Sequence, residues 1–138
     1  MKPRTKIILA LVALLLLIAA FFGVRFLRSF EAYRSAVTDT IFEHTDASGI
    51  PDGTYVGEYD ANFVYAKVEV TVENEAIAGI ALLTHRHGRG AEAEVIIEAM
   101  VAEQRIDVDA ITGATHSCTV IKKAVDNALS SALSDAVY

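Results

Sequence analysis

Residues 64–84 read VYAKVEVTVENEAIAGIALLT and contain the clearest structural pattern in the chain. From Val64 to Val72, valine or alanine alternates with a tyrosine, lysine, glutamate or threonine, which is the period-two pattern of a half-buried strand. Glu73-Asn74-Glu75 predicts a tight turn, and residues 76–84 predict the next strand. The stretch therefore predicts an antiparallel hairpin.

The segments around the hairpin complete a small domain. Residues 54–59 (TYVGEY) predict a short strand before it, and residues 91–104 have helical spacing, with two glutamates at the start. A last helix is predicted from an apolar stripe of Val120, Ile121, Ala124, Val125, Ala128, Leu129 and Ala132. This order predicts an α+β fold, in which a small antiparallel sheet packs on two helices.

An uncharged apolar run, IILALVALLLLIAAFFGV, occupies residues 7–24 near the N-terminus. As a helix it would be about 27 Å long, close to the thickness of a bilayer's hydrocarbon core. It predicts one N-terminal transmembrane helix, and the alternative is a cleaved signal peptide. Lys2, Arg4 and Lys6 precede the run, as in an export signal. We therefore expect a single-pass protein of the cell membrane with its soluble domain on the extracytoplasmic side.

These patterns divide the chain into three parts. Residues 1–24 are expected to be a cytoplasmic tip and the transmembrane anchor. Residues 25–51 are expected to be a stalk and linker, because apolar residues continue at helical spacing to about residue 42 and EHTDASGIPDG follows at 43–53. Residues 52–138 are expected to form the soluble domain.

Charge differs sharply between the two ends of the chain. Six lysines and arginines and one glutamate give residues 1–34 a charge of +5. Because the net charge of the chain is −6, residues 35–138 carry a charge of −11. An acidic soluble part argues against nucleic acid as a partner. The one cysteine, Cys118, excludes an intramolecular disulfide.

A motif that bears on chemistry stands just before the last helix, where residues 109–115 read DAITGAT. Thr112, Gly113 and Ala114 form a turn of small residues that lets a ligand approach the backbone closely. Because the turn opens onto a helix N-terminus, it suits a phosphate group. Thr115, His116, Ser117 and Thr119 add hydroxyl and imidazole groups. The alternative is that Thr115 or Ser117 only caps the helix.

DAITGAT resembles the acceptor motif of the FMN-binding domain family, in which a flavin transferase moves FMN from FAD onto the last threonine. The family includes flavin-bearing subunits of the sodium-translocating NADH:quinone reductase and Rnf complexes, as well as small exported flavoproteins. The likeness extends over about residues 52–133. Residues 84–90 read THRHGRG, where the large-complex subunits typically have an acidic-Thr-Pro-Gly turn. The chain therefore resembles the covalently flavinylated, exported members more closely.

The resemblance implies that Thr115 carries FMN as a phosphoester and that Asp109 and Gly113 belong to the sequence that the transferase recognises. The cofactor-binding residues are then expected to be Thr112, Gly113, Ala114, Thr115, His116 and Ser117. Expected partners are the flavin transferase, redox partner proteins or a membrane reductase, and the membrane itself.

An electron-transfer flavoprotein is the function that these features favour, because the chain shows no nicotinamide site and no catalytic acid/base pair. Two alternatives stay open at this point. The first alternative is a flavin-containing subunit of a membrane reductase complex. The second is a non-redox phosphate-binding scaffold.

Other candidate residues have two readings each. His85 and His87 alternate at the end of a predicted strand, but no third ligand stands at a recognisable spacing, so no metal site is predicted. With Arg86 and Arg89 they either line the flavin or form a solvated basic loop. Cys118 is expected to be a small buried residue rather than a thiolate. Three tyrosines are expected near the flavin or in the core: Tyr55, Tyr59 and Tyr65.

Overall fold

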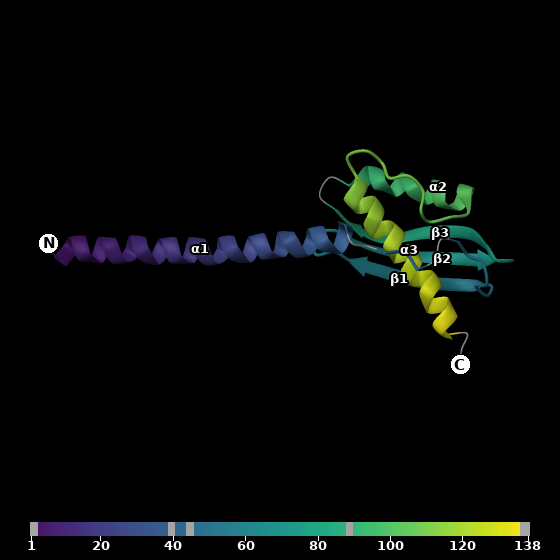
Figure 1. The fold of residues 1–138 in the computed structure, drawn as a ribbon, viewed down its shortest axis with the longest axis horizontal. Coiled ribbons are helices and arrows are strands. Elements are labelled where there is room, and N and C mark those ends of the chain that lie inside the picture. Colours follow the sequence, from purple (N-terminus) through teal and green to yellow (C-terminus); the bar gives the residue numbers. More distant parts are fainter. Residues whose placement is uncertain (1–2, 39–40, 44–45, 88–89, 136–138) are drawn as a thin grey trace.

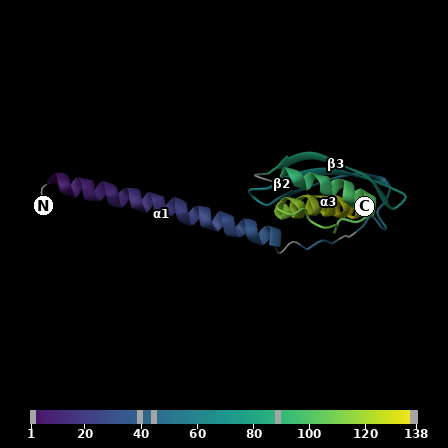
Figure 2. The ribbon, with the colours of Figure 1, turned by 90° about the horizontal axis from the view of Figure 1, so that it is seen from above.

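The computed structural model describes residues 3–38, 41–43, 46–87 and 90–135. A long helix α1 (Pro3–Thr38) extends away from a body that contains the other elements (Figures 1 and 2). The body consists of β1 (Gly53–Asp60), β2 (Tyr65–Glu73), β3 (Ala76–Arg86), the 3₁₀ helix η1 (Ala91–Val95), α2 (Ile96–Glu103) and α3 (Thr115–Asp135). The predicted α+β fold is therefore confirmed.

The sheet is antiparallel, with the order β1-β2-β3 in the described residues. Asn74 and Glu75 join β2 to β3 with φ angles of 54° and 60°. Two positive φ angles are what a type I′ hairpin turn requires. The predicted hairpin is thus confirmed, although β3 runs two residues further than expected, because Tyr65 pairs with Arg86 and Ala66 with His85.

One face of the sheet forms the core of the body. The alternating residues Ala66, Val68, Val70 and Val72 of β2 are fully buried, as the period-two pattern predicted. Helix α3 covers β1 and β2, while α2 lies beside β3 (Figure 1). The predicted apolar stripe of α3 is buried along its whole length, from Val120 to Ala132.

Gly57 of β1 allows α3 to lie directly on the sheet. A Cβ atom at this position would lie 2.1 Å from the carbonyl oxygen of Ala124 and 2.4 Å from the backbone nitrogen of Ala128. These partners are backbone atoms, which cannot rotate away. The glycine on the strand and the alanines on the helix therefore set the distance between the two layers.

The helix predicted at residues 91–104 begins as the 3₁₀ helix η1 and continues as α2. It ends at Gln104, which has a left-handed backbone with φ 55°. The Gln104 side chain accepts a hydrogen bond from the Ile77 amide at 2.8 Å and donates to the Ile77 carbonyl at 2.9 Å. These bonds hold the end of α2 against β3. They stabilise the left-handed backbone of Gln104, a conformation that glycine usually adopts at the end of a helix.

Helix α1 contains the predicted apolar run and continues without a break into the predicted stalk. The part Pro3–Ala32 is long and apolar enough to cross a membrane, and none of it is buried inside the protein. By length and composition the helix fits either a membrane anchor or a signal sequence.

The segment after α1 is attached to α3 by a buried carboxylate. Asp126 accepts hydrogen bonds from the Glu43 amide at 3.1 Å and from Lys123 Nζ at 2.6 Å. Lys123 Nζ also donates to the carbonyl of Ile41 at 2.9 Å. The chain is therefore held at the surface of the body shortly after α1 ends.

Candidate functional site

The DAITGAT segment forms a hydrogen-bonded turn immediately before α3. The Ala114 amide donates to the carbonyl of Ile111 at 3.0 Å, and Gly113 has a φ angle of 85°. A type II turn places its third residue near this φ angle, which favours glycine. Nothing lies within 4 Å of a Cβ atom built on Gly113. The glycine is therefore required by its backbone conformation and not by lack of space.

The segment that leads to this turn is bonded to side chains of α3. Buried Lys122 donates from Nζ to the carbonyl of Val108, and the Ile111 amide donates to Cys118 Sγ at 3.3 Å. Cys118 is fully buried, in agreement with the expectation of a small core residue. Since both partners belong to α3, the position of the turn depends on that helix.

An exposed ion pair stands at the start of the same segment. Arg105 Nε donates to Asp107 Oδ1 at 2.7 Å. The hydrogen bond from the guanidinium lowers the pKa of the Asp107 carboxyl below its ordinary value. Because both side chains are exposed, the pair adds little to stability.

Thr115 is the first residue of α3, and its side chain is exposed. Ala114, which precedes it, has no hydroxyl with which to cap the helix. Thr115 Oγ makes no hydrogen bond among the described residues, whereas Thr119 Oγ donates to the Thr115 carbonyl at 3.1 Å. The capping alternative therefore does not account for Thr115. Its hydroxyl is directed to solvent where amide groups and the helix dipole favour a phosphate.

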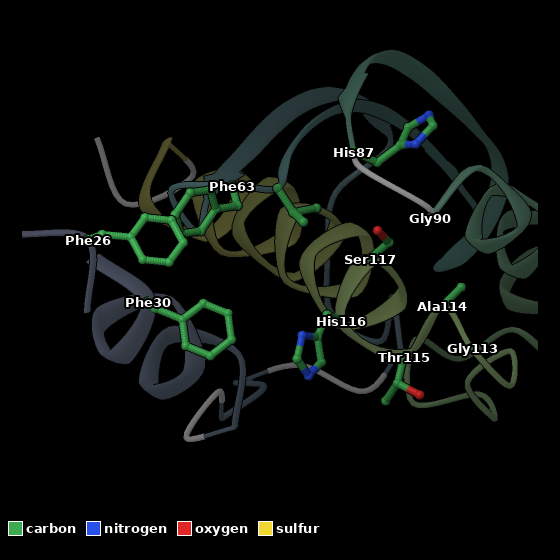
Figure 3. A pocket seen from close by; sticks show the side chains of 11 residues that line it. Phe26, Phe30, Phe63, His87, Gly90, Gly113, Ala114, Thr115, His116 and Ser117 are labelled. Carbon is green, nitrogen blue, oxygen red and sulfur yellow. The ribbon is translucent and has the colours of Figure 1, made fainter. Parts of the chain in front are cut away.

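A cavity of about 660 Å³ lies between the start of α3 and the part of α1 that contains Phe26 and Phe30. Figure 3 shows the rings of Phe26, Phe30 and Phe63 on one side of it and the first turn of α3 on the other. Its lining is completed by residues from the β1–β2 connection, the end of β3 and the α3 turn: Val64, His87, Gly90, Gly113, Ala114, Thr115, His116 and Ser117. The cavity is thus open to solvent, with an apolar side at the phenyl rings and a polar side at Thr115.

The structure divides the predicted site residues into two groups. Residues 113–117, from Gly113 to Ser117, line the cavity. Asp109 and Thr112 do not line it and are exposed on the outer side of the turn. Such exposure suits residues that another protein must reach, which is the role that the resemblance implies for Asp109.

The aromatic wall was missed by sequence reasoning. Phe26 and Phe30 lie on the apolar side of the predicted stalk, but no local pattern connects them with a turn more than 80 residues later. Their side chains are 62% and 46% exposed, and that of Phe63 is 45% exposed. Phenyl rings that line a cavity without being covered provide surface on which a flat aromatic ligand can stack.

The basic residues near the end of β3 do not act together. Arg86 does not line the cavity and donates to Asp60 at 3.2 Å and to the carbonyl of Asn62 at 2.9 Å. Of the two readings for Arg86, the structure favours the solvated one, because an exposed ion pair with Asp60 holds the side chain. His87 does line the cavity, and Arg89 lies outside the described residues.

The tyrosines also lie apart from the cavity. Tyr55 and Tyr59 are half-buried against the core, which is the second of the two readings. Tyr65 donates from its hydroxyl to Glu58 at 2.8 Å, and this hydrogen bond raises the pKa of the phenol. Aromatic contact with a cavity ligand therefore comes from the phenylalanines.

The residues around the cavity fit FMN. Ligand pockets that enclose molecules of this size measure about 300–1,000 Å³ and combine apolar walls with a few polar groups. The three phenyl rings suit an isoalloxazine ring, and the α3 start suits its phosphate. The distribution of polar groups thus matches a ligand with one aromatic end and one anionic end.

Comparison with known families supports the same ligand. The family model described as the FMN-binding domain matches residues 65–130, a range that includes β2, β3, the DAITGAT turn and most of α3. No curated protein matches the chain. The chain is therefore a flavin-binding protein, and residues 65–130 belong to the FMN-binding domain family.

Proposed function

We propose that this protein is a membrane-anchored electron-transfer flavoprotein that carries FMN on Thr115 as a phosphoester. The observation that carries the proposal is the exposed, unbonded hydroxyl of Thr115 at the polar end of the cavity. When bound, FMN supplies transfer of one or two electrons. A covalent bond prevents loss of the cofactor outside the cytoplasm.

Attachment requires a flavin transferase with FAD as the donor. The bond that forms joins Thr115 Oγ to the phosphorus of the FMN half, and the bond that breaks is the pyrophosphate linkage of FAD. AMP leaves, and the hydroxyl proton of Thr115 passes to the transferase. Asp109 and Thr112 are exposed beside Thr115, so a docked transferase can contact them together.

The chain's own residues hold the cofactor in two ways. The first turn of α3 presents amide groups and a positive dipole end to the phosphate. Arg86 does not contribute a positive charge there, because it is paired with Asp60. The rings of Phe26, Phe30 and Phe63 would provide the apolar surface that holds the isoalloxazine. The cofactor is then fixed at both ends.

The position of the aromatic wall favours a redox partner at the membrane. Phe26 and Phe30 follow the last residue of the apolar run, Val24, by two and six helical residues. At about 1.5 Å per residue, the two side chains lie about 3 Å and 9 Å beyond that run. A cavity at this height brings the cofactor close to an integral membrane reductase or a lipid-soluble electron carrier.

The body of the protein lies on the extracytoplasmic side in this proposal, since the short basic N-terminus precedes the apolar run. We place the start of the FMN domain at residue 52, upstream of the matched range. Strand β1 supports this boundary, because it pairs with β2 over its whole length from Gly53 to Asp60.

The test of attachment is denaturing electrophoresis of the full chain after co-expression with a flavin transferase. We expect a fluorescent band and a mass increase of one FMN minus water on the peptide that contains Thr115. Thr115→Val should remove both signals. Thr119→Val, one turn later on the same helix, should keep them and serves as the matched control.

Two results would refute the proposal. Fluorescence that survives in Thr115→Val would place the cofactor on another residue. A wild-type protein that binds FMN but releases all of it under denaturing conditions would show a non-covalent site. Electron transfer is tested separately. The flavin absorbance reports reduction of the cofactor and is followed with and without addition of the native membrane fraction.

A further inference from the structure

The end of β3 holds a cluster of three potential metal ligands. His85 Nδ1 lies 3.0 Å from Glu94 Oε1, and the rings of His85 and His87 have their centroids 4.5 Å apart. One potential ligand atom from each of these three side chains lies within 4.8 Å of the other two. Sequence reasoning found no third ligand, since Glu94 follows His85 by nine residues without a recognised spacing.

The local chain path explains why these side chains meet. His85 and His87 are two residues apart at the end of a strand, so they project to the same side, while Arg86 between them projects to the other. Gly90 packs so closely on α3 that a Cβ atom there would lie 1.8 Å from Ser117 Oγ. This contact lets η1 start beside β3 and brings Glu94 over the histidines.

Two ring nitrogens in this cluster lack a hydrogen-bond partner. His85 Nε2 and His87 Nδ1 are buried and bond to no other group in the part of the chain that the structure describes. The His85 side chain is 2% exposed, so water does not readily satisfy it. A buried nitrogen without a partner destabilises a folded protein, so a cation that binds these nitrogens would offset this cost.

The contact with Glu94 prepares His85 to bind a cation. When Nδ1–H donates to the carboxylate, the lone pair of the neutral ring is on Nε2. Metal-binding histidines commonly donate their second nitrogen to a carboxylate in this way. The Glu94 side chain is 47% exposed, so an ion can enter from solvent past it.

We propose that His85 Nε2 and His87 Nδ1 bind a divalent transition-metal ion, for which Zn²⁺ is the best chemical match, and that Glu94 orients His85 through Nδ1. Imidazole nitrogens are common zinc ligands, and water can complete the coordination. His87 also lines the cavity, so the ion is held at the cavity wall.

The test is a calorimetric titration of the full chain with Zn²⁺. The protein is purified in detergent without a polyhistidine tag and is first treated with a chelator. We expect one equivalent to bind, and we expect Glu94→Gln and His87→Gln each to weaken binding at least about tenfold. Glu98→Gln, an exposed change four residues beyond Glu94, should leave the affinity unchanged.

Three outcomes would overturn the proposal: no stoichiometric binding, equal affinity in Glu94→Gln and His87→Gln, or loss of binding only in His116→Gln. Neither tested side chain is fully buried, so folding is expected to survive and is checked by circular dichroism. The titration is repeated on Thr115→Val, where binding should persist. Failure of metal binding is thus distinct from failure of FMN attachment.

Discussion

Helices α1 and α3 are both long and rich in apolar residues, yet their apolar residues meet opposite environments. In α1 the side chains of the apolar run are exposed, as for Leu17 at 69%. In α3 the stripe from Val120 to Ala132 is buried under the sheet. The protein therefore buries the apolar side chains of α3 itself, whereas it leaves those of α1 uncovered.

This difference assigns separate tasks to the two helices. Helix α3 carries Thr115, holds the DAITGAT turn through Lys122 and Cys118, and closes the core, so damage to it should affect stability and site together. Helix α1 contributes Phe26 and Phe30 to the cavity but little to the core. Changes in α1 should therefore affect the cofactor environment more than the stability of the body.

The largest expected effect comes from separating α3 from the sheet. Gly57→Ala places a methyl group 2.1 Å from the carbonyl oxygen of Ala124, and the helix must move. We expect a loss of about 3 kcal/mol in the free energy of unfolding, because the added methyl group meets backbone atoms and no side chain can rotate to make room for it. The measurement is chemical denaturation of the full chain in detergent, followed by circular dichroism.

Gly79→Ala is the matched control for this change. Gly79 lies in β3, and nothing lies within 4 Å of a Cβ atom built there. Its stability should stay within about 0.5 kcal/mol of the wild type. Equal stability of Gly57→Ala and Gly79→Ala would show that α3 does not rest on β1 as described.

A smaller effect is expected at the junction between the two helices. Asp126→Ala leaves the Glu43 amide without its acceptor and the Lys123 ammonium with only the carbonyl of Ile41. Because the carboxylate is buried and charged, we expect a loss of about 2 kcal/mol in the free energy of unfolding. Limited proteolysis with mass spectrometry should also show faster cleavage between α1 and β1.

Glu98→Ala provides the comparison, as it removes an exposed carboxylate from α2. It should change neither stability nor cleavage. If Asp126→Ala is cleaved at the wild-type rate, the attachment of the linker to α3 does not restrict the chain.

The sheet and the last helix were predictable because their patterns are local. Alternation over Val64–Val72 and helical spacing from Val120 to Ala132 are both direct consequences of one-sided burial. The DAITGAT turn was also predictable, since Gly113 and the residues around it form a contiguous motif. Local periodicity and motif therefore identified the body and one end of the site.

The remaining features depend on contacts between distant residues. Phe26 and Phe30 reach the cavity only because α1 ends beside α3, and Glu94 reaches His85 only because Gly90 allows a close turn. The ion pair of Arg86 was not predictable, since its partner Asp60 belongs to another strand. Such relations leave no periodic trace in a single sequence.

The smallest of these effects compares a glycine from each helix region. Gly113→Ala forces alanine into a φ angle of 85°, which costs about 1 kcal/mol and should lower the melting temperature of the body by about 4–8 °C. Gly23→Ala, in the apolar run of α1, meets nothing within 4 Å and should leave that temperature unchanged. Thermal unfolding of both variants in the same detergent separates the two cases. A drop for Gly23→Ala equal to that for Gly113→Ala would mean that α1 and the body unfold as one unit, contrary to the separate roles inferred for the two helices.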